Sequence, residues 1–131
     1  MQEEQLKVLV VEDNPDIRSL VTKLLSADGH HIFSAKCGMD ALAILKANAI
    51  DIVLLDINLP CKSGLDVLEE IRTATKKKYH EIPVIMISSR SSIEDIDLAL
   101  SLGADSYLVK PFRGATVREK VRTYSKMAIS A

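Results

Sequence analysis

Short apolar runs alternate with longer amphipathic segments along the whole chain. Five runs are too short for helices and are typical of strands covered on both faces: residues 6–11, 32–35, 52–55, 83–87 and 107–109. The segments that follow these runs repeat apolar residues every three or four positions, which predicts helices beginning near Pro15, Met39, Gly64, Ser91 and Arg113. The pattern therefore predicts five consecutive strand–helix units.

Local signals mark several helix ends. Asn14 and Pro15 are suited to be an N-cap and a first helical residue, and Ser91 with Glu94 has the spacing of a capping box. Lys76–Lys78 is expected to lie in the loop beyond the third helix. We expect the helix after Ser91 to bury Ile93, Ile96 and Leu100.

Five such units predict an α/β protein with a doubly wound, five-stranded parallel sheet and helices on both faces. We expect a single domain over residues 1–131, with a core from about residue 6 to residue 125. Residues 126–131 are expected to be a frayed tail or the beginning of a linker.

Composition agrees with this picture and excludes several classes of protein. The 131 residues are 47% hydrophobic with a formal net charge of −1, which is typical of a globular domain and gives no electrostatic reason for nucleic-acid binding. The acidic N-terminal segment is wrongly charged for a signal peptide, and no apolar run approaches the roughly 18 residues of a membrane span. Cys37 and Cys61 lack CxxC or Cys/His spacing, so they suggest neither a disulfide framework nor a zinc site. We therefore expect the protein to be located in a reducing cytoplasm.

Polar residues interrupt the apolar runs where the strands end. Glu12 and Asp13 follow the first strand and Asp56 ends the third, while Ser88 and Lys110 end the fourth and fifth. Ligands of doubly wound sheets bind outside the carboxyl ends of the strands, so these side chains should share one edge.

Three carboxylates on one edge repel each other, and a hard cation such as Mg²⁺ relieves the repulsion. Such an ion has a coordination position left for a phosphate oxygen. A hydroxyl and a lysine can donate hydrogen bonds to the other phosphoryl oxygens. The set indicates phosphoryl transfer to a carboxylate, with Asp56 as the best-placed nucleophile. Taken singly, each residue also has an ordinary role, such as capping a turn or favouring a helix N-terminus.

The sequence resembles the receiver domain of two-component response regulators. Its length is similar to that of the single-domain chemotaxis type. The resemblance runs from about Lys7 to Tyr124 and rests on VLVVEDNPDIR, DIVLLDINLPCKSGLDVLEEIR, IPVIMISS and GADSYLVKPF. It implies a flavodoxin-like fold with strand order 2-1-3-4-5. It also implies a signalling domain rather than an enzyme, one that assists its own phosphorylation and dephosphorylation.

The resemblance gives the acidic residues specific roles. Asp56 would be the phosphoacceptor, and its donor would be a histidine kinase or a phosphotransfer protein. Glu12, Asp13, Asp56 and the backbone carbonyl of Asn58 would hold Mg²⁺, with Mn²⁺ as an alternative.

The same resemblance implies a switch. Lys110 would neutralise a phosphoryl oxygen, and Ser88 would turn inward to bond the phosphoryl group. Tyr107 would follow Ser88 from an outward to an inward rotamer. The readout would be the face made by the fourth helix, the fifth strand and the last helix, around residues 92–124.

Some positions depart from the family's usual pattern or vary within it. Ser89 stands where the family usually has Ala or Gly, and Asn58 and Arg90 flank the site at variable positions. All three are candidate modulators of access to the site or of phosphoryl lifetime. Arg113-Gly114 replaces the usual start of the last helix, which affects the output face rather than the chemistry.

Two other functions stay open. An aspartyl-phosphate hydrolase would need a second carboxylate where Asp56-Ile57-Asn58 has Asn. A docking module of receiver shape would act without phosphorylation. The expected partners are the phosphodonor and an output protein or missing output domain, with no nucleic acid bound by this domain alone and no membrane. We expect a monomer or a weak dimer linked to phosphorylation, and pattern alone does not identify the pathway.

Overall fold

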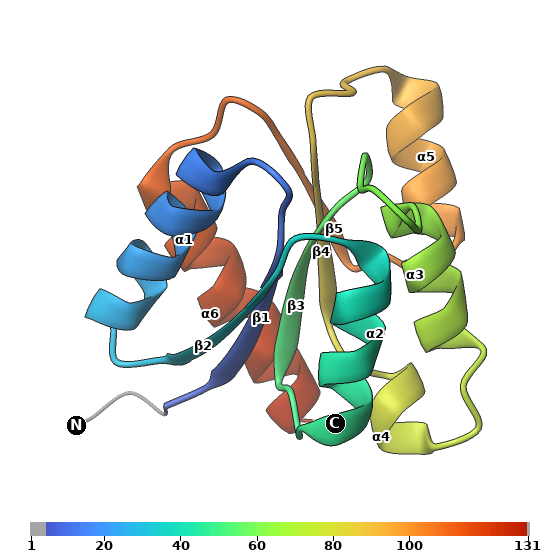
Figure 1. Ribbon diagram of the computed structural model, residues 1–131, viewed down its shortest axis with the longest axis horizontal. Coiled ribbons are helices and arrows are strands. Elements are labelled where there is room, and N and C mark those ends of the chain that lie inside the picture. Colours follow the sequence, from blue (N-terminus) through green and yellow to red (C-terminus); the bar gives the residue numbers. More distant parts are fainter. Residues whose placement is uncertain (1–4, 131) are drawn as a thin grey trace.

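Five strands form one parallel sheet in the order β2-β1-β3-β4-β5 (Figure 1). The computed structural model describes residues 5–130, apart from the side chains of residues 77, 78 and 126–130. The strands are β1 (Lys7–Val11), β2 (His31–Ala35), β3 (Ile52–Asp56), β4 (Val84–Ser88) and β5 (Ser106–Val109). The predicted fold class and strand order are confirmed.

Helices cover both faces of this sheet (Figure 1). One face carries α1 (Pro15–Ala27) and α6 (Gly114–Ser130), and the other carries α2 (Gly38–Ala47), α3 (Gly64–Arg72) and α5 (Ile93–Ser101). The backbone of 126–130 continues α6, while Ala131 and the linker expected there lie outside the described residues. Because the strands are parallel, β1 begins and α6 ends at the edge opposite the carboxyl ends of the strands. Across residues 5–130, no helix combines the length and hydrophobicity needed to cross a membrane.

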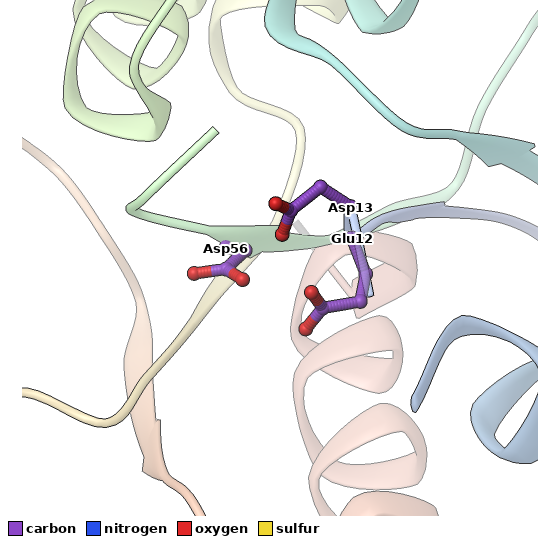
Figure 2. A group of neighbouring side chains, drawn as sticks. All are labelled: Glu12, Asp13 and Asp56. Carbon is purple, nitrogen blue, oxygen red and sulfur yellow. The ribbon is translucent and has the colours of Figure 1, made fainter. Parts of the chain in front are cut away.

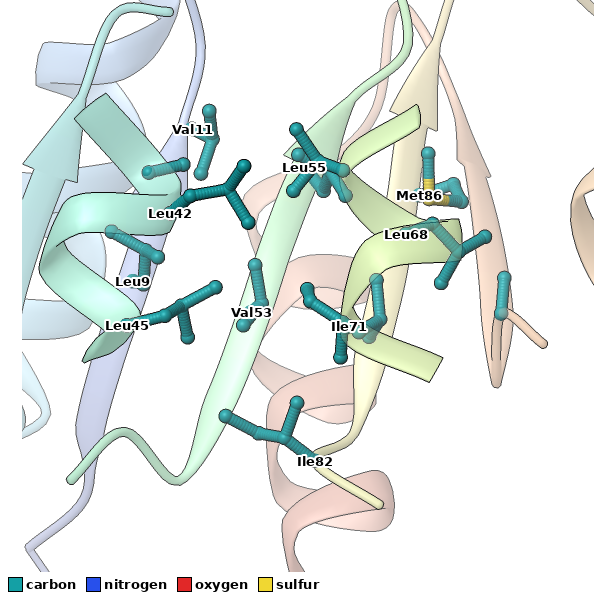
Figure 3. Packing of buried hydrophobic residues seen from close by; sticks show 14 of the residues in the cluster. Leu9, Val11, Leu42, Leu45, Val53, Leu55, Leu68, Ile71, Ile82 and Met86 are labelled. Atoms are coloured by element: carbon teal, nitrogen blue, oxygen red, sulfur yellow. The ribbon is translucent and has the colours of Figure 1, made fainter. Parts of the chain in front are cut away.

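Alternation along the strands divides the core into two layers. In β1 and β3, Leu9, Val53 and Leu55 pack toward α2 and α3, as Figure 3 shows. Their sequence neighbours, such as Val8 and Leu54, pack toward α1 and α6. Both layers are fully buried along β3 and β4, which explains why these strands read as continuous apolar runs.

The segment after α3 was predicted to be a loop, and this is wrong in part. A single helical turn, α4 (Lys77–His80), forms there. The carbonyl of Lys76 accepts hydrogen bonds from the backbone N–H groups of Tyr79 and His80, both at 3.0 Å. Arg72 then ties the end of the turn to the sheet by donating to the carbonyls of His80 and Ile82 at 3.0 and 2.7 Å.

The prediction for α5 is wrong at its cap and on its buried face. The N-cap is Ser92, whose Oγ accepts from the backbone N–H of Asp95. The fully buried helical residue is the small Ala99, while Ile96 is half-buried and Ile93 and Leu100 are 74% and 42% exposed. The apolar residues of α5 are spread around the helix, so periodicity could not identify the face against the sheet.

Candidate functional site

Asp56 ends β3 as an almost fully buried carboxylate, 3% exposed. Its Oδ1 accepts a hydrogen bond from the backbone N–H of Asn58 at 3.1 Å. Its Oδ2 accepts from Lys110 Nζ at 2.9 Å, which joins the end of β3 to the residue after β5. The charge is therefore compensated by an ammonium and a backbone donor, as burial of a carboxylate requires.

Gly64 allows α3 to start directly against the backbone of Asp56. A Cβ at this position would collide with the Asp56 carbonyl, and the Gly64 N–H donates to the carbonyl of Ile57 at 2.8 Å. Residues 57–63 therefore form a short loop whose two ends are pinned together beside Asp56. The sequence pattern marks Gly64 only as a helix start and gives no sign of this positioning role.

Substituting Gly64→Ala is expected to lower the free energy of unfolding by about 2–3 kcal/mol, since backbone must move to admit the methyl group. Urea denaturation would measure the loss. Gly114→Ala is the matched control, because its nearest neighbours are flexible Leu24 side-chain atoms and alanine favours the helix. Equal stability of the two variants would contradict the proposed role of Gly64.

Glu12 is the second buried carboxylate and lies just beyond β1. Its Oε2 accepts from the backbone N–H of Asn14 at 3.0 Å, and its Oε1 lies 2.7 Å from Lys110 Nζ in an ion pair poorly directed for a hydrogen bond. Arg18 holds the turn that follows by donating to the carbonyls of Glu12 and Asp13 at 2.8 and 3.4 Å. Arg18 was missed at the sequence level, because a basic residue in a first helical turn gives no signal of its own.

Asp13 is exposed and completes a group of three carboxylates (Figure 2). One ligand oxygen from each of Glu12, Asp13 and Asp56 lies within 4.8 Å of the others. When all three are ionised, Lys110 compensates one of the three negative charges and two remain. Hard oxygen ligands with an uncompensated double negative charge fit a divalent cation such as Mg²⁺.

Burial and neighbouring charges also shift the pKa values of Glu12 and Lys110. Burial raises the pKa of Glu12, and the neighbouring Asp56 raises it further, while Lys110 and the Asn14 N–H oppose the change. Burial alone would lower the pKa of Lys110, but its hydrogen bond to Asp56 and its ion pair with Glu12 outweigh burial and leave the pKa raised. Lys110 therefore stays protonated at neutral pH.

Glu12→Gln is expected to stabilise the protein near neutral pH in metal-free buffer, by on the order of 1 kcal/mol. A raised carboxyl pKa contributes stability that is present below the ordinary value of 4.5 and is lost as pH rises through the raised value. The gain from the substitution should therefore shrink below pH 4.5. Urea denaturation across pH in EDTA would test it, and a variant less stable than wild type at neutral pH would contradict it.

The remaining candidate residues meet at the mouth of the site. Ser88 is buried at the end of β4, and its Oγ accepts from the backbone N–H of Arg90 at 3.0 Å. Tyr107 Oη donates to the carbonyl of Arg90 at 2.8 Å. Arg90 Nη2 donates to Asn58 Oδ1 at 3.0 Å, while Ser89 is exposed. The direction of Arg90, which sequence left open, is thus toward Asn58.

Comparisons with known proteins agree with this geometry. A family model for the response regulator receiver domain matches residues 8–122. The transcriptional regulatory protein CpxR of Klebsiella pneumoniae is 40% identical over 116 residues, which cover 88% of this chain and 47% of that protein. The chain thus spans about half the length of the curated relatives it matches.

Solved structures show the same similarity. The chemotaxis response regulator CheY4 of Vibrio cholerae has a TM-score of 0.85 at 28% identity, covering 92% of this chain and 99% of that one. NtrX from Brucella abortus has a TM-score of 0.86 at 34% identity, covering 97% of this chain and 29% of that one. With the strand order found here and a family model that covers most of its length, the chain belongs to the response regulator receiver domains, the phosphorylation-accepting signalling domains of two-component systems.

Proposed function

We propose that Asp56 accepts a phosphoryl group from a histidine kinase or a phosphotransfer protein in a Mg²⁺-dependent reaction. The observation that carries this proposal is the environment of Asp56. Its buried carboxylate is held by Lys110 at 2.9 Å and lies within 4.8 Å of two further carboxylates at the carboxyl edge of the sheet. This combination is costly for stability and useful for phosphoryl transfer.

In the proposed reaction, an Asp56 oxygen attacks the phosphorus atom. The new P–O bond forms as the P–N bond to the donor histidine breaks, which leaves an acyl phosphate on Asp56 and returns the electron pair to the histidine ring. The Asn58 N–H and Lys110 hold the carboxylate in one orientation before attack. Lys110, kept charged by its raised pKa, then stabilises the negative charge of the transferred group.

Glu12, Asp13, Asp56 and the Asn58 carbonyl would hold the Mg²⁺ ion, and Mn²⁺ has the same preference for oxygen ligands. The ion would neutralise charge on the phosphoryl oxygens. Support comes from the two negative charges that Lys110 leaves uncompensated. Burial is the main cause of the raised pKa of Glu12, and the negative charge of Asp56 adds to it.

The contacts of Arg90 suggest how phosphorylation could reach the surface. Ser88 and Tyr107 both bond the backbone of Arg90, one at its N–H and the other at its carbonyl. A phosphoryl group adds about −1.5 to −2 charge and competes for the Ser88 hydroxyl. Turning Ser88 toward it would break the bond to Arg90 and free Tyr107 to change rotamer, which shifts the population of an existing alternative state.

The output face is proposed to be α5, β5 and α6, within residues 92–124. Three large apolar side chains of α5 are exposed: Ile93 at 74%, Leu98 at 47% and Leu100 at 42%. Such side chains on one short helix suit a protein partner or a second copy of the domain. Because similar proteins such as CpxR are transcriptional regulatory proteins, control of transcription through an attached or separate output module is the proposed outcome.

Asn58, Ser89 and Arg90 are proposed to modulate the phosphoryl lifetime. The Arg90 side chain reaches Asn58 across the mouth of the site, and its Nη1 also lies 3.9 Å from Asp95 Oδ1. A guanidinium in this place can shield the acyl phosphate from water or attract its charge. Ser89, being exposed, bears on the entry of the donor instead.

Intact mass after incubation with Mg²⁺ and a small-molecule phosphodonor tests the proposal. We expect one added phosphoryl group, and none when EDTA removes the metal. Mg²⁺ should also raise the stability of the unphosphorylated protein, by about 2.7 kcal/mol at a hundredfold excess over its Kd. Absence of an adduct with rapid quenching and a panel of donors would instead favour a docking module that works without phosphorylation.

A further inference from the structure

Two cysteines meet at the N-terminal end of α2, outside the acidic site. Cys37 directly precedes α2, and Cys61 lies in the loop between β3 and α3. Each thiol shifts the pKa of the other, and the backbone N–H groups of Met39 and Gly38 in the first turn of α2 also lower the pKa of Cys61. The fold thus brings close together two nucleophilic thiols that are 24 residues apart in the sequence.

Main-chain packing holds these two thiol-bearing loops together. A Cβ at Gly38 would collide with the carbonyl oxygen and the Cβ of Lys62, so glycine lets segment 37–38 lie directly against segment 61–62. Both loops lie at the carboxyl edge of the sheet (Figure 1). The approach of the two thiols is therefore built into the backbone and does not depend on long flexible side chains.

Cys61 also occupies an unusual backbone conformation. Its φ is 60°, in the left-handed region that costs an ordinary L-residue about 1–2 kcal/mol and that glycine adopts freely. A non-glycine residue that keeps a strained backbone conformation is a reason to look for a function of that residue.

The two thiols differ in reactivity. Interaction with Cys37 and with the N–H groups of Met39 and Gly38 lowers the pKa of Cys61, against the opposing effects of desolvation and of Asp40. The same thiol–thiol interaction raises the pKa of Cys37. Cys61 is exposed and Cys37 is partly exposed. An accessible thiol that ionises more readily than the thiol beside it suits the attacking cysteine, and its neighbour suits the resolving one.

We propose that Cys37 and Cys61 form a reversible redox site, which a peroxide oxidises to an intramolecular disulfide. The Cys61 thiolate attacks a peroxide oxygen, so that an S–O bond forms, the O–O bond breaks, and the released hydroxide leaves as water after protonation. Cys37 then attacks the Cys61 sulfur, so that an S–S bond forms and the S–O bond breaks. The second hydroxide takes the Cys37 proton and leaves as water. Two thiols lose two electrons, the peroxide gains them, and a dithiol reductant reverses the change.

Metal binding is the other common use of paired thiols, and the surroundings do not support it here. Within the described residues, the group of three or more potential ligands that lie together is Glu12, Asp13 and Asp56, which excludes both cysteines. Two thiols alone leave a tetrahedral zinc site incomplete. A disulfide that forms transiently is also the expected kind in a reducing compartment.

This redox site goes beyond phosphoryl acceptance, since forming the crosslink requires neither Asp56 nor a metal. The cysteine pair nevertheless lies next to the acidic site. Cys61 belongs to the same loop as Asn58, between the ends pinned by Asp56 and Gly64. Oxidation would tie this loop covalently to the start of α2.

Peptide mapping of the intact chain tests the proposal. Wild-type protein is treated with a small excess of hydrogen peroxide, alkylated without reduction and digested with trypsin. Cleavage after Lys36, Lys46 and Lys62 places the two cysteines in peptides 37–46 and 47–62. We expect these two peptides to appear linked, with the loss of two hydrogen atoms and of both free thiols, and to separate on reduction. Peptides that stay unlinked and alkylated, or a crosslink between two chains, would overturn it.

The roles of the two cysteines need single variants. In Cys37→Ser, a dimedone probe should capture a sulfenic acid on Cys61, because no resolving thiol remains. In Cys61→Gly, which also suits the left-handed backbone, Cys37 should be labelled more slowly than Cys61 is in Cys37→Ser, because Cys37 is the less exposed thiol. Labelling of Cys37 alone would overturn the assignment of Cys61 as the attacking thiol. Circular dichroism of each variant checks that the fold is intact.

Discussion

Asp56→Asn is expected to abolish phosphoryl incorporation under conditions in which the wild-type chain gains one group. The amide oxygen is a far weaker nucleophile than a carboxylate, and no acyl phosphate can form on it. The fold should survive, because the amide oxygen can still accept from the Asn58 N–H and Lys110 keeps its ion pair with Glu12. Intact mass after rapid quenching measures the loss.

Asp66→Asn is the matched control for this experiment. Asp66 is an exposed carboxylate in the first turn of α3, close in sequence to Asp56 but without its burial. We expect it to be phosphorylated at the Asp56 position like the wild type. An adduct that persists in Asp56→Asn would show that another residue is the acceptor, and peptide mapping would then identify it.

Lys110→Met is expected to cost on the order of 3 kcal/mol of stability in metal-free buffer at neutral pH. The substitution keeps an unbranched side chain of similar size but leaves the buried carboxylates of Glu12 and Asp56 facing each other without a cation. The loss should decrease at acidic pH, because protonation of either carboxyl relieves the repulsion. Urea denaturation at several pH values measures both effects.

The exposed Lys23 provides the control, since Lys23→Met removes the same charge from the surface of α1 and should change stability little. Added Mg²⁺ should restore part of the stability that Lys110→Met loses, because the ion can compensate the same carboxylates. We also expect much slower phosphorylation in this variant. Similar unfolding midpoints for the two variants would show that the ion pairs of Lys110 contribute little.

The strands and their polar ends could be predicted because burial on both faces leaves a strong signal. In β3, five consecutive buried residues end in Asp56, so the change from apolar to acidic marks the edge of the sheet. That Glu12, Asp56 and Lys110 share this edge then follows from the parallel strands, while the strand order came from the resemblance. What depends on a single side-chain conformation, such as Arg90 reaching Asn58, leaves no such pattern.

Failures of prediction have the same physical origin. In α5, apolar residues occur on several sides, and tertiary packing selected the small Ala99 for burial rather than Ile93 or Leu100. Cys37 and Cys61 show no motif, because their contact depends on how two loops fold across the ends of different strands. Gly64 and Arg18 act through the backbone, and hydropathy carries no record of that role.

Since β1 begins and α6 ends at the edge away from Asp56, the geometry bears on how the chain can be tethered (Figure 1). A surface or a fused protein attached at either end would lie at the edge of the sheet opposite Asp56. The mouth formed by Asn58 and Arg90 would then face the bulk solution. Immobilisation on a biosensor through an end tag should therefore leave the approach of donor proteins unobstructed, whereas coupling through the exposed thiol of Cys61 would place the anchor on the same loop as Asn58.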